Sequence, residues 1–305
     1  MKNKILDIRY ILFFLVLLLL ITPFLQNNLN IFEIEPLKGD IDEVQEVNFS
    51  FNEWFDANYQ NQQETYLNES FGFRNSLVRL HNQLRFSLFK NANARGIVVG
   101  IDNYLYELPY INAYYGIDFI GEDSIKKRMQ QLKYVQDTLE KLDKNIILIF
   151  AAGKASFYPE YIPEKYRVEK KINNYEVYTK YAHELGIAHI DFNKWFIENK
   201  NISPYPLFPQ YGIHWSNYSM FYVADSIISY IEDLRNINMR HLYWDEIKFD
   251  QAKKGDYDIA EGMNLLYYLP SYEMAYPKVF VEIDTGQVKP RIVSVADSFY
   301  WGIYN

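Results

Sequence analysis

The step from an amphipathic helix into an uninterrupted apolar run constrains the fold of this chain most. Between residues 124 and 143, apolar side chains recur every three or four positions, and most residues between them are charged or Gln. That spacing predicts an amphipathic helix. Residues 146–150 then form an unbroken apolar run of strand length, which is typical of a parallel strand buried on both faces. A helix that leads directly into a buried strand indicates the α/β class.

The same order of elements recurs along the chain. Apolar periodicity predicts further helices at 77–88, 175–185 and 216–234, and apolar or β-branched runs predict strands at 96–100, 187–192 and 291–295. We therefore expect an α/β fold in which helices flank a parallel sheet. The stretch 236–290 shows no regular pattern, and we interpret it as an insertion.

The N-terminus carries a membrane-targeting signal, because Lys2, Lys4 and Arg9 lead into the apolar run 10–25. A signal anchor and a signal peptide both have this form, but no small-x-small cleavage site follows, which favours a retained transmembrane anchor. Acidic residues such as Glu33 follow the run. The N-terminus is therefore expected in the cytoplasm and the rest of the chain outside the membrane.

These patterns predict three regions. A signal anchor spans 1–27, an acidic extracytoplasmic stalk without catalytic residues spans 28–69, and a globular domain spans 70–305. The chain length of 305 residues and the 49% hydrophobic content are sufficient for a sizeable core.

Composition excludes several kinds of partner and site. The 31 Lys and Arg against 39 Asp and Glu give a formal net charge of -8, which is the wrong sign for a protein that binds nucleic acid. The chain has no cysteine, so thiolate metal sites and cysteine nucleophiles are excluded. The five histidines show no paired ligand spacing. We expect no metal and no cofactor.

Ser298 is the first candidate for chemistry. It follows Asp297 directly after the predicted strand 291–295, and ligands bind at the edge of an α/β sheet where parallel strands end. If a helix begins there, its first N–H groups point toward the serine hydroxyl and can stabilise an oxyanion. An alternative is that Asp297 and Ser298 only cap a helix.

His214 is the second candidate. It lies just before Ser216, a residue type that caps helices, and the helix predicted at 216–234. A histidine at a helix N-terminus is disfavoured as imidazolium, and a neutral imidazole can accept a proton from a serine. A histidine that merely packs beside Trp215 is the alternative.

Four segments, in order, resemble the AlgX/AlgJ-like family of alginate-type polysaccharide O-acetyltransferases, whose catalytic domain is a permuted SGNH hydrolase fold. The matching segments are Phe73-Arg74-Asn75 with residues 98–106, the lysine-to-proline segment 154–163, His214-Trp215-Ser216, and Asp297-Ser298-Phe299. The resemblance covers about residues 70–305.

The resemblance implies roles for individual residues. Ser298 would be the acyl-carrying nucleophile, His214 the general base and Asp297 a supporting neighbour. Lys154, Trp215 and Tyr300 are candidates for substrate binding.

The chain also departs from the family pattern. The family usually has Asp two residues before the histidine, whereas this chain has Gly212, and Tyr211 fills the place three residues before it. Asp191, at the end of the strand predicted at 187–192, is a candidate replacement for the third triad member. Ala296 stands where Gly is usual, and because the chain stops seven residues after Ser298, we expect a truncated C-terminus.

The function implied by the resemblance is O-acetyl transfer to an exported polysaccharide. A multipass membrane acyltransferase would supply the acetyl group, and the protein would be anchored in the inner membrane with its globular domain in the periplasm or outside the cell. A carbohydrate esterase or deacetylase on the same fold is one alternative, because water can replace the sugar hydroxyl as acceptor. A non-catalytic glycan-binding assembly protein is the other, since the usual acid is missing.

Overall fold

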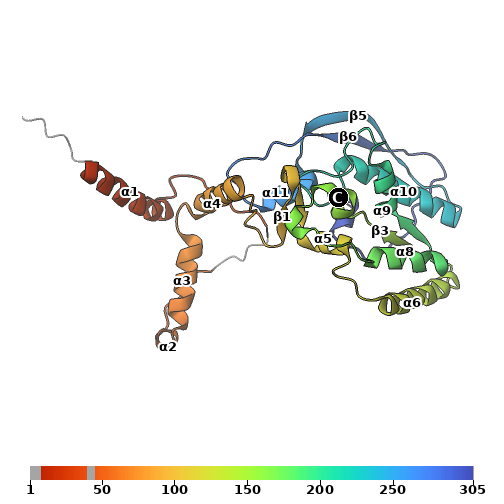
Figure 1. Cartoon of the computed structure of the whole chain (residues 1–305), viewed down its shortest axis with the longest axis horizontal. Coiled ribbons are helices and arrows are strands. Elements are labelled where there is room, and N and C mark those ends of the chain that lie inside the picture. Colours follow the sequence, from red (N-terminus) through yellow and green to blue (C-terminus); the bar gives the residue numbers. More distant parts are fainter. Residues whose placement is uncertain (1–7, 40–44, 305) are drawn as a thin grey trace, which may run out of the picture. The chain divides into compact units, whose positions relative to one another are not determined.

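The computed structural model describes residues 8–39 and 45–304. The chain divides into two compact units (Figure 1). One contains Met1–Phe89 with Gly262–Tyr268, and the other contains Lys90–Glu261 with Leu269–Asn305.

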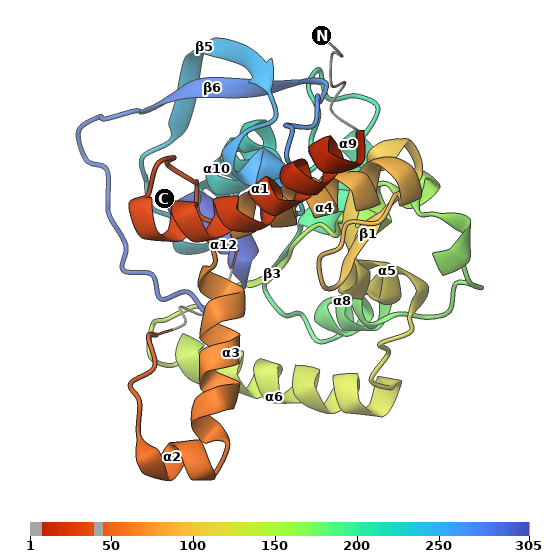
Figure 2. The same cartoon turned by 90° about the vertical axis from the view of Figure 1, so that its left-hand side faces the viewer.

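The first unit is helical. Its elements are α1 (Ile8–Leu29), α2 (Phe51–Phe55), α3 (Asn58–Ser70) and α4 (Arg74–Phe89) (Figure 2). Helix α1 has 22 residues and a mean hydropathy of 2.5, so it is long and apolar enough to cross a membrane. The N-terminal signal is therefore a candidate span, although Lys2 and Lys4 lie outside the described residues.

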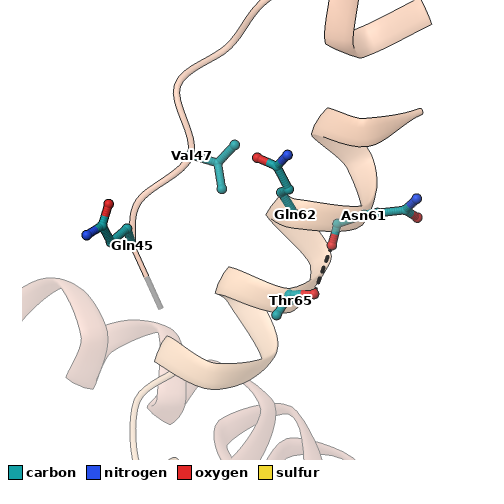
Figure 3. A pocket seen from close by; sticks show the side chains of 5 residues that line it. All are labelled: Gln45, Val47, Asn61, Gln62 and Thr65. Carbon is teal, nitrogen blue, oxygen red and sulfur yellow. Dashed lines mark hydrogen bonds between the residues drawn. The ribbon is translucent and has the colours of Figure 1, made fainter. Parts of the chain in front are cut away.

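The stretch predicted as a stalk contains regular structure. Both α2 and α3 lie within or beside residues 28–69. A shallow hollow between the chain at Gln45–Val47 and α3 is lined by polar side chains together with Val47 (Figure 3). Val47 and Gln62 face each other across it. Helix α3 has no long apolar stripe, so no periodic pattern predicted this helix.

The second unit contains the predicted α/β arrangement. Strands β3 (Leu148–Phe150) and β4 (His189–Asp191) pair in parallel, with Ile149 opposite Ile190. Helices α6 (Glu122–Glu140) and α8 (Asn174–Glu184) pack together beside them. The α/β class and the helices and strands predicted around residues 122–192 are confirmed.

Local capping explains where the helices begin. Asn173 and Glu176 form a reciprocal capping box at the start of α8. The Ser216 side chain accepts the backbone N–H of Ser219 and starts α10 (Asn217–Arg235). The cap predicted at Ser216 is confirmed, and it fixes the chain immediately after His214.

Apart from two longer strands, described below, the remaining elements of the second unit are short. They are β1 (Ile97–Val99), η1 (Ile101–Asn103), β2 (Leu105–Glu107), α5 (Leu108–Tyr115), α7 (Lys154–Phe157), η2 (Pro159–Tyr161), η3 (Glu164–Tyr166), α9 (Phe192–Asn199), η4 (Lys254–Tyr257), α11 (Asp258–Gly262) and α12 (Ser298–Tyr304). Strands β1 and β2 pair antiparallel, as expected for a hairpin.

The interpretation of 236–290 as irregular is wrong. This stretch contains β5 (Leu242–Gln251) and β6 (Glu273–Val281), which pair antiparallel with an irregularity between Trp244 and Glu246. Charged residues at exposed positions of β5 interrupt the apolar pattern from which a strand would be predicted. The segment between these strands returns toward His214.

The strand predicted at 291–295 is not formed. These residues have no regular structure, and Val293 and Val295 are 94% and 100% exposed. An apolar run becomes a strand only where a neighbouring strand offers backbone partners. In the described residues β3 and β4 pair with each other alone, so 291–295 leads toward Ser298 as an exposed segment without regular structure.

Candidate active site

Ser298 and His214, 84 residues apart in the sequence, meet in the second unit. The Oγ of Ser298 lies 2.8 Å from Nε2 of His214. Ser298 is the first residue of α12, and the Asp297 carboxylate accepts the N–H of Phe299 at 3.0 Å. Asp297 therefore caps α12, while the Ser298 hydroxyl is exposed and points to the imidazole. Asp297 therefore performs the capping predicted for this motif, and the Ser298 hydroxyl takes no part in it. The nucleophile role predicted for Ser298 is compatible with that cap.

Phe299 fixes the serine against the histidine. Its side chain is 3% exposed, and its ring centroid lies 4.8 Å from that of His214 and 5.0 Å from that of Trp215. Tyr110 lies 6.1 Å away on another side. One buried aromatic residue thus places the adjacent hydroxyl.

The other ring nitrogen of His214 contacts Asp258. The distance from Nδ1 to the Asp258 Oδ2 is 2.6 Å. Because Oδ2 is an acceptor when ionised, we assign the proton to Nδ1, which leaves Nε2 free to accept from Ser298. Ser298, His214 and Asp258 are therefore joined in one chain of hydrogen bonds.

Sequence reasoning proposed Asp191 for this place, and that assignment needs correction. Asp191 caps α9 by accepting the N–H of Lys194 and also accepts the Tyr175 hydroxyl at 2.8 Å. The acid beside His214 comes from the stretch 236–290 instead. Nothing in the local sequence marks Asp258, which lies 44 residues after the histidine.

Lys154, predicted to bind substrate, instead lies in the interior and contacts backbone carbonyl groups. It is fully buried, and its Nζ donates to the carbonyl oxygens of Gln210 at 2.9 Å and Gly212 at 2.6 Å. Burial lowers the pKa of Lys154 to about 7, an effect that Asp258 partly opposes. The lysine supports the backbone that leads to His214.

The two aromatic candidates for substrate binding differ in exposure. Trp215 is 6% exposed and packs against Phe192, Phe196 and Phe299, so it belongs to the core. Tyr300 is partly exposed next to the serine, and its N–H donates to the Asp297 carbonyl at 3.2 Å. A ligand-binding role remains a prediction for Tyr300.

Two residues that sequence reasoning missed lie near this chain of hydrogen bonds. Burial raises the pKa of Glu107, and the Asp258 charge adds to that rise while His214 opposes it. Burial, with the charges of Glu107, Asp297 and Asp258, raises the pKa of Tyr110 to about 12. The residues around Ser298 thus form an acidic, aromatic environment.

The sequence model of one protein family matches this chain. The family is described as an SGNH hydrolase-like domain of acetyltransferase AlgX, and the match spans residues 97–264, more than half of the chain. The chain belongs to this family. The family predicted from the sequence is confirmed, and His214 and Asp258 both lie within the matched region, whereas Ser298 lies beyond it.

Solved structures that match this chain include two from Pseudomonas. The first is the O-acetyltransferase domain of Pseudomonas putida AlgJ, at 16% identity and a TM-score of 0.43, which covers 61% of this chain and 65% of that one. The second is Pseudomonas aeruginosa AlgX, at 13% identity and a TM-score of 0.42, which covers 66% of this chain and 49% of that one. The chain thus spans less than two thirds of either relative. No curated protein sequence matches it.

Proposed function

We propose that this protein is an O-acetyltransferase that carries the acetyl group on Ser298. The observation that carries the proposal is the 2.8 Å contact between Ser298 Oγ and His214 Nε2. A hydroxyl within hydrogen-bond distance of a neutral imidazole is the arrangement of an activated serine nucleophile. The family's acetyltransferase description supports acetyl as the transferred group.

The first step forms the acetyl-serine. Ser298 Oγ attacks the carbonyl carbon of the acetyl donor while its proton passes to His214 Nε2. The tetrahedral intermediate then expels the donor's oxygen, which takes the proton from His214. The C–O bond to the donor breaks and a new ester to Ser298 remains.

The second step returns the enzyme to its starting state. An acceptor hydroxyl attacks the acetyl-serine, gives its proton to His214, and Ser298 Oγ leaves and recovers that proton. A sugar hydroxyl as acceptor gives a transferase, and water gives an esterase. We propose an exported polysaccharide as the acceptor, in keeping with the family resemblance.

The N-terminal helix supports a location at a membrane. Helix α1 would anchor the protein in the inner membrane, and the basic residue Arg9 before an apolar run that acidic residues follow favours a cytoplasmic N-terminus. The second unit would then face the periplasm or the exterior. A multipass membrane acyltransferase would pass the acetyl group outward to Ser298.

Intact-mass analysis of the full chain in detergent, after incubation with an activated acetyl ester, tests the proposal. We expect a gain of one acetyl group that Ser298→Ala and His214→Ala both abolish, with unchanged melting temperatures as the folding control. Acetyl transfer to glycan oligosaccharides, compared with release of acetate, then separates transferase from esterase. A folded protein that gains no acetyl group contradicts the proposed mechanism.

A further inference from the structure

The backbone before His214 runs unusually close to the segment that carries Asp258. A Cβ built at Gly212 would lie 2.5 Å from the Gly255 carbonyl oxygen and 3.0 Å from the Asp256 carbonyl carbon. Real Cβ atoms do not approach backbone so closely, so position 212 has no room for a side chain. The place where the family pattern has an acid is occupied by another stretch of backbone.

Several hydrogen bonds hold these two segments together. Asp258 Oδ1 accepts the N–H of Ile213 at 3.0 Å, and the N–H of Ala260 donates to the Tyr211 carbonyl at 3.2 Å. Fully buried Asp256 accepts the N–H of Asn217 at 3.0 Å. The carboxylate of Asp258 therefore reaches the imidazole from a segment that is fixed on both sides of it.

We propose that Asp258 is the positioning residue of His214, and that Gly212 is the accompanying change that admits the 255–258 backbone. The inference rests on the proposed function. Asp258 holds the proton on Nδ1, keeps Nε2 directed at Ser298, and stabilises the imidazolium that forms when the serine gives up its proton. Asp258 thus brings to His214, from another segment, the acid that the family pattern places two residues before the histidine.

The Asp258→Asn variant tests the positioning role. The amide keeps an oxygen for the N–H of Ile213 but no longer carries the charge that fixes the tautomer. We expect acetyl-serine formation to fall by roughly 100- to 10,000-fold, with a melting temperature close to that of the wild type. Asp245→Asn, at an exposed position of β5, is the matched control and should keep full activity.

A proton NMR signal separates this proposal from the proposed function. A strongly downfield imidazole N–H signal is expected in the wild type and in Ser298→Ala, and its loss is expected in Asp258→Asn and His214→Ala. If the wild type gains no acetyl group but the signal behaves this way, the proposed function fails and the positioning role stands. If the wild type is acetylated and Asp258→Asn is equally fast, the positioning role is overturned.

The Gly212→Asp/Asp258→Asn double variant tests the proposal that position 212 must lack a side chain to leave room for the 255–258 backbone. We expect no recovery of acetylation and a lower melting temperature than Asp258→Asn alone, because the new Cβ meets the Gly255 carbonyl. Recovery of acetylation to near the wild-type rate would show that an acid fits at position 212 and would overturn this part.

A separate observation concerns the first unit, where five aromatic residues gather around α2. We call Phe49, Phe51, Trp54, Phe55 and Tyr59 the aromatic tip. The Phe49 ring lies 5.2–5.8 Å from those of Phe51, Trp54 and Tyr59. Phe51 is 72% and Phe55 81% exposed, and α2 and α3 contain no buried residue. Four of these rings contact one another, and four of the five side chains, Tyr59 excepted, are exposed to solvent.

The aromatic tip is tied to the end of the candidate membrane span. Gly72, just after α3, packs against the backbone of Pro23 and Asn27 in α1. The 13 residues of α3 extend about 20 Å at 1.5 Å per residue. The tip at the other end of α3 is thus at most about one helix length from the end of α1.

We infer that the aromatic tip rests in the interfacial layer of the membrane that α1 crosses. Trp and Tyr favour this layer because their rings combine apolar surface with a polar N–H or O–H group, and the exposed Phe rings gain free energy by leaving water. No Lys or Arg occurs between Lys38 and Arg74, so attraction to anionic headgroups does not contribute. Contact with lipid by aromatic burial alone is insensitive to salt.

The absence of native cysteine allows a direct test in the full chain. Asn52→Cys in α2, labelled with an environment-sensitive fluorophore, is reconstituted in phosphatidylcholine vesicles that contain nitroxide-labelled lipid. We expect quenching that is equal at low and high salt, and its loss when Phe51→Ser and Phe55→Ser are added. Leu18→Cys in α1 reports on anchoring.

The outcomes are distinct. Quenching at Leu18→Cys without quenching at Asn52→Cys overturns the interfacial role while anchoring stands. No quenching at either position overturns both. Energy transfer between differently labelled Asn52→Cys chains, in place of lipid quenching, would identify a second copy of the chain as the occupant and also overturns the inference.

Discussion

His214 and Ser298 are held in opposite ways. The backbone around His214 is fixed on several sides. Lys154 donates hydrogen bonds to two backbone carbonyl groups, and Asp258 accepts the N–H of Ile213 and contacts the imidazole Nδ1. Ser298 instead follows an exposed segment and is placed by Phe299 immediately after it. The proposed base, His214, is therefore preorganised by the protein interior, whereas the proposed nucleophile, Ser298, depends on one docked aromatic side chain.

The largest loss of stability and activity is expected when the support of the backbone before His214 is removed. Lys154→Met keeps the length of the side chain but leaves the carbonyl groups of Gln210 and Gly212 without their donor, at a cost of about 1–3 kcal/mol for each group. A displaced His214 should lower acetyl-serine formation roughly 100-fold. Urea unfolding and intact-mass kinetics measure both. Lys194→Met, at an exposed position of α9, is the control, and wild-type kinetics in Lys154→Met would contradict the role of the lysine.

Loss of the Phe299 ring beside Ser298 should lower activity but destabilise the protein less than loss of a central core ring does. A core Phe→Ala change costs about 3–5 kcal/mol, and Phe196→Ala, fully buried, should show that cost. Phe299→Ala should lower acetyl-serine formation roughly 10- to 100-fold, while the urea midpoint moves less than in Phe196→Ala, because α12 can undock locally. Equal midpoint shifts in the two variants would show that α12 unfolds only with the whole unit.

A pH-dependent effect is expected for the segment that carries Asp258. Burial raises the pKa of Asp256 from 3.8 to about 6, so the folded protein binds this proton more tightly than the unfolded chain. Stability from this group is present below pH 4 and is lost as pH rises through 6, by at most roughly 3 kcal/mol. Asp256→Asn should lack that decline.

Urea unfolding between pH 4.5 and 7.5 measures this difference. The gap in unfolding free energy between Asp256→Asn and wild type should move in favour of the variant as pH rises. Asp245→Asn, exposed on β5, should follow the wild type. A constant gap across the range would mean that Asp256 is ionised in the folded protein well below pH 6.

The smallest effect is expected in the exposed segment before Ser298. Val293→Ser and Val295→Ser replace side chains that are 94% and 100% exposed, so unfolding free energies should change by less than about 0.5 kcal/mol. Acetyl-serine formation should also be unchanged. A loss of more than about 1 kcal/mol in the same unfolding measurement would show that the segment is buried in solution, as its apolar pattern predicts.

Sequence patterns predicted the parts of this fold that depend on local periodicity. Helix α6, the β3–β4 pair and the Ser216 cap each follow from neighbouring residues, and the pairing of Ser298 with His214 followed from motif order. Asp258 could not be found in this way, because its approach to His214 depends on the path of the chain between β5 and β6. The burial of Lys154 is likewise set by tertiary packing.

The close approach at Gly212 also limits which substitutions this site can accept. An acid at position 212 would need a withdrawal of the 255–256 backbone together with the new carboxyl group. Either change alone leaves a clash or a histidine without its acid. Comparison of the residues flanking the histidine alone would therefore miss the carboxylate that contacts His214 from position 258.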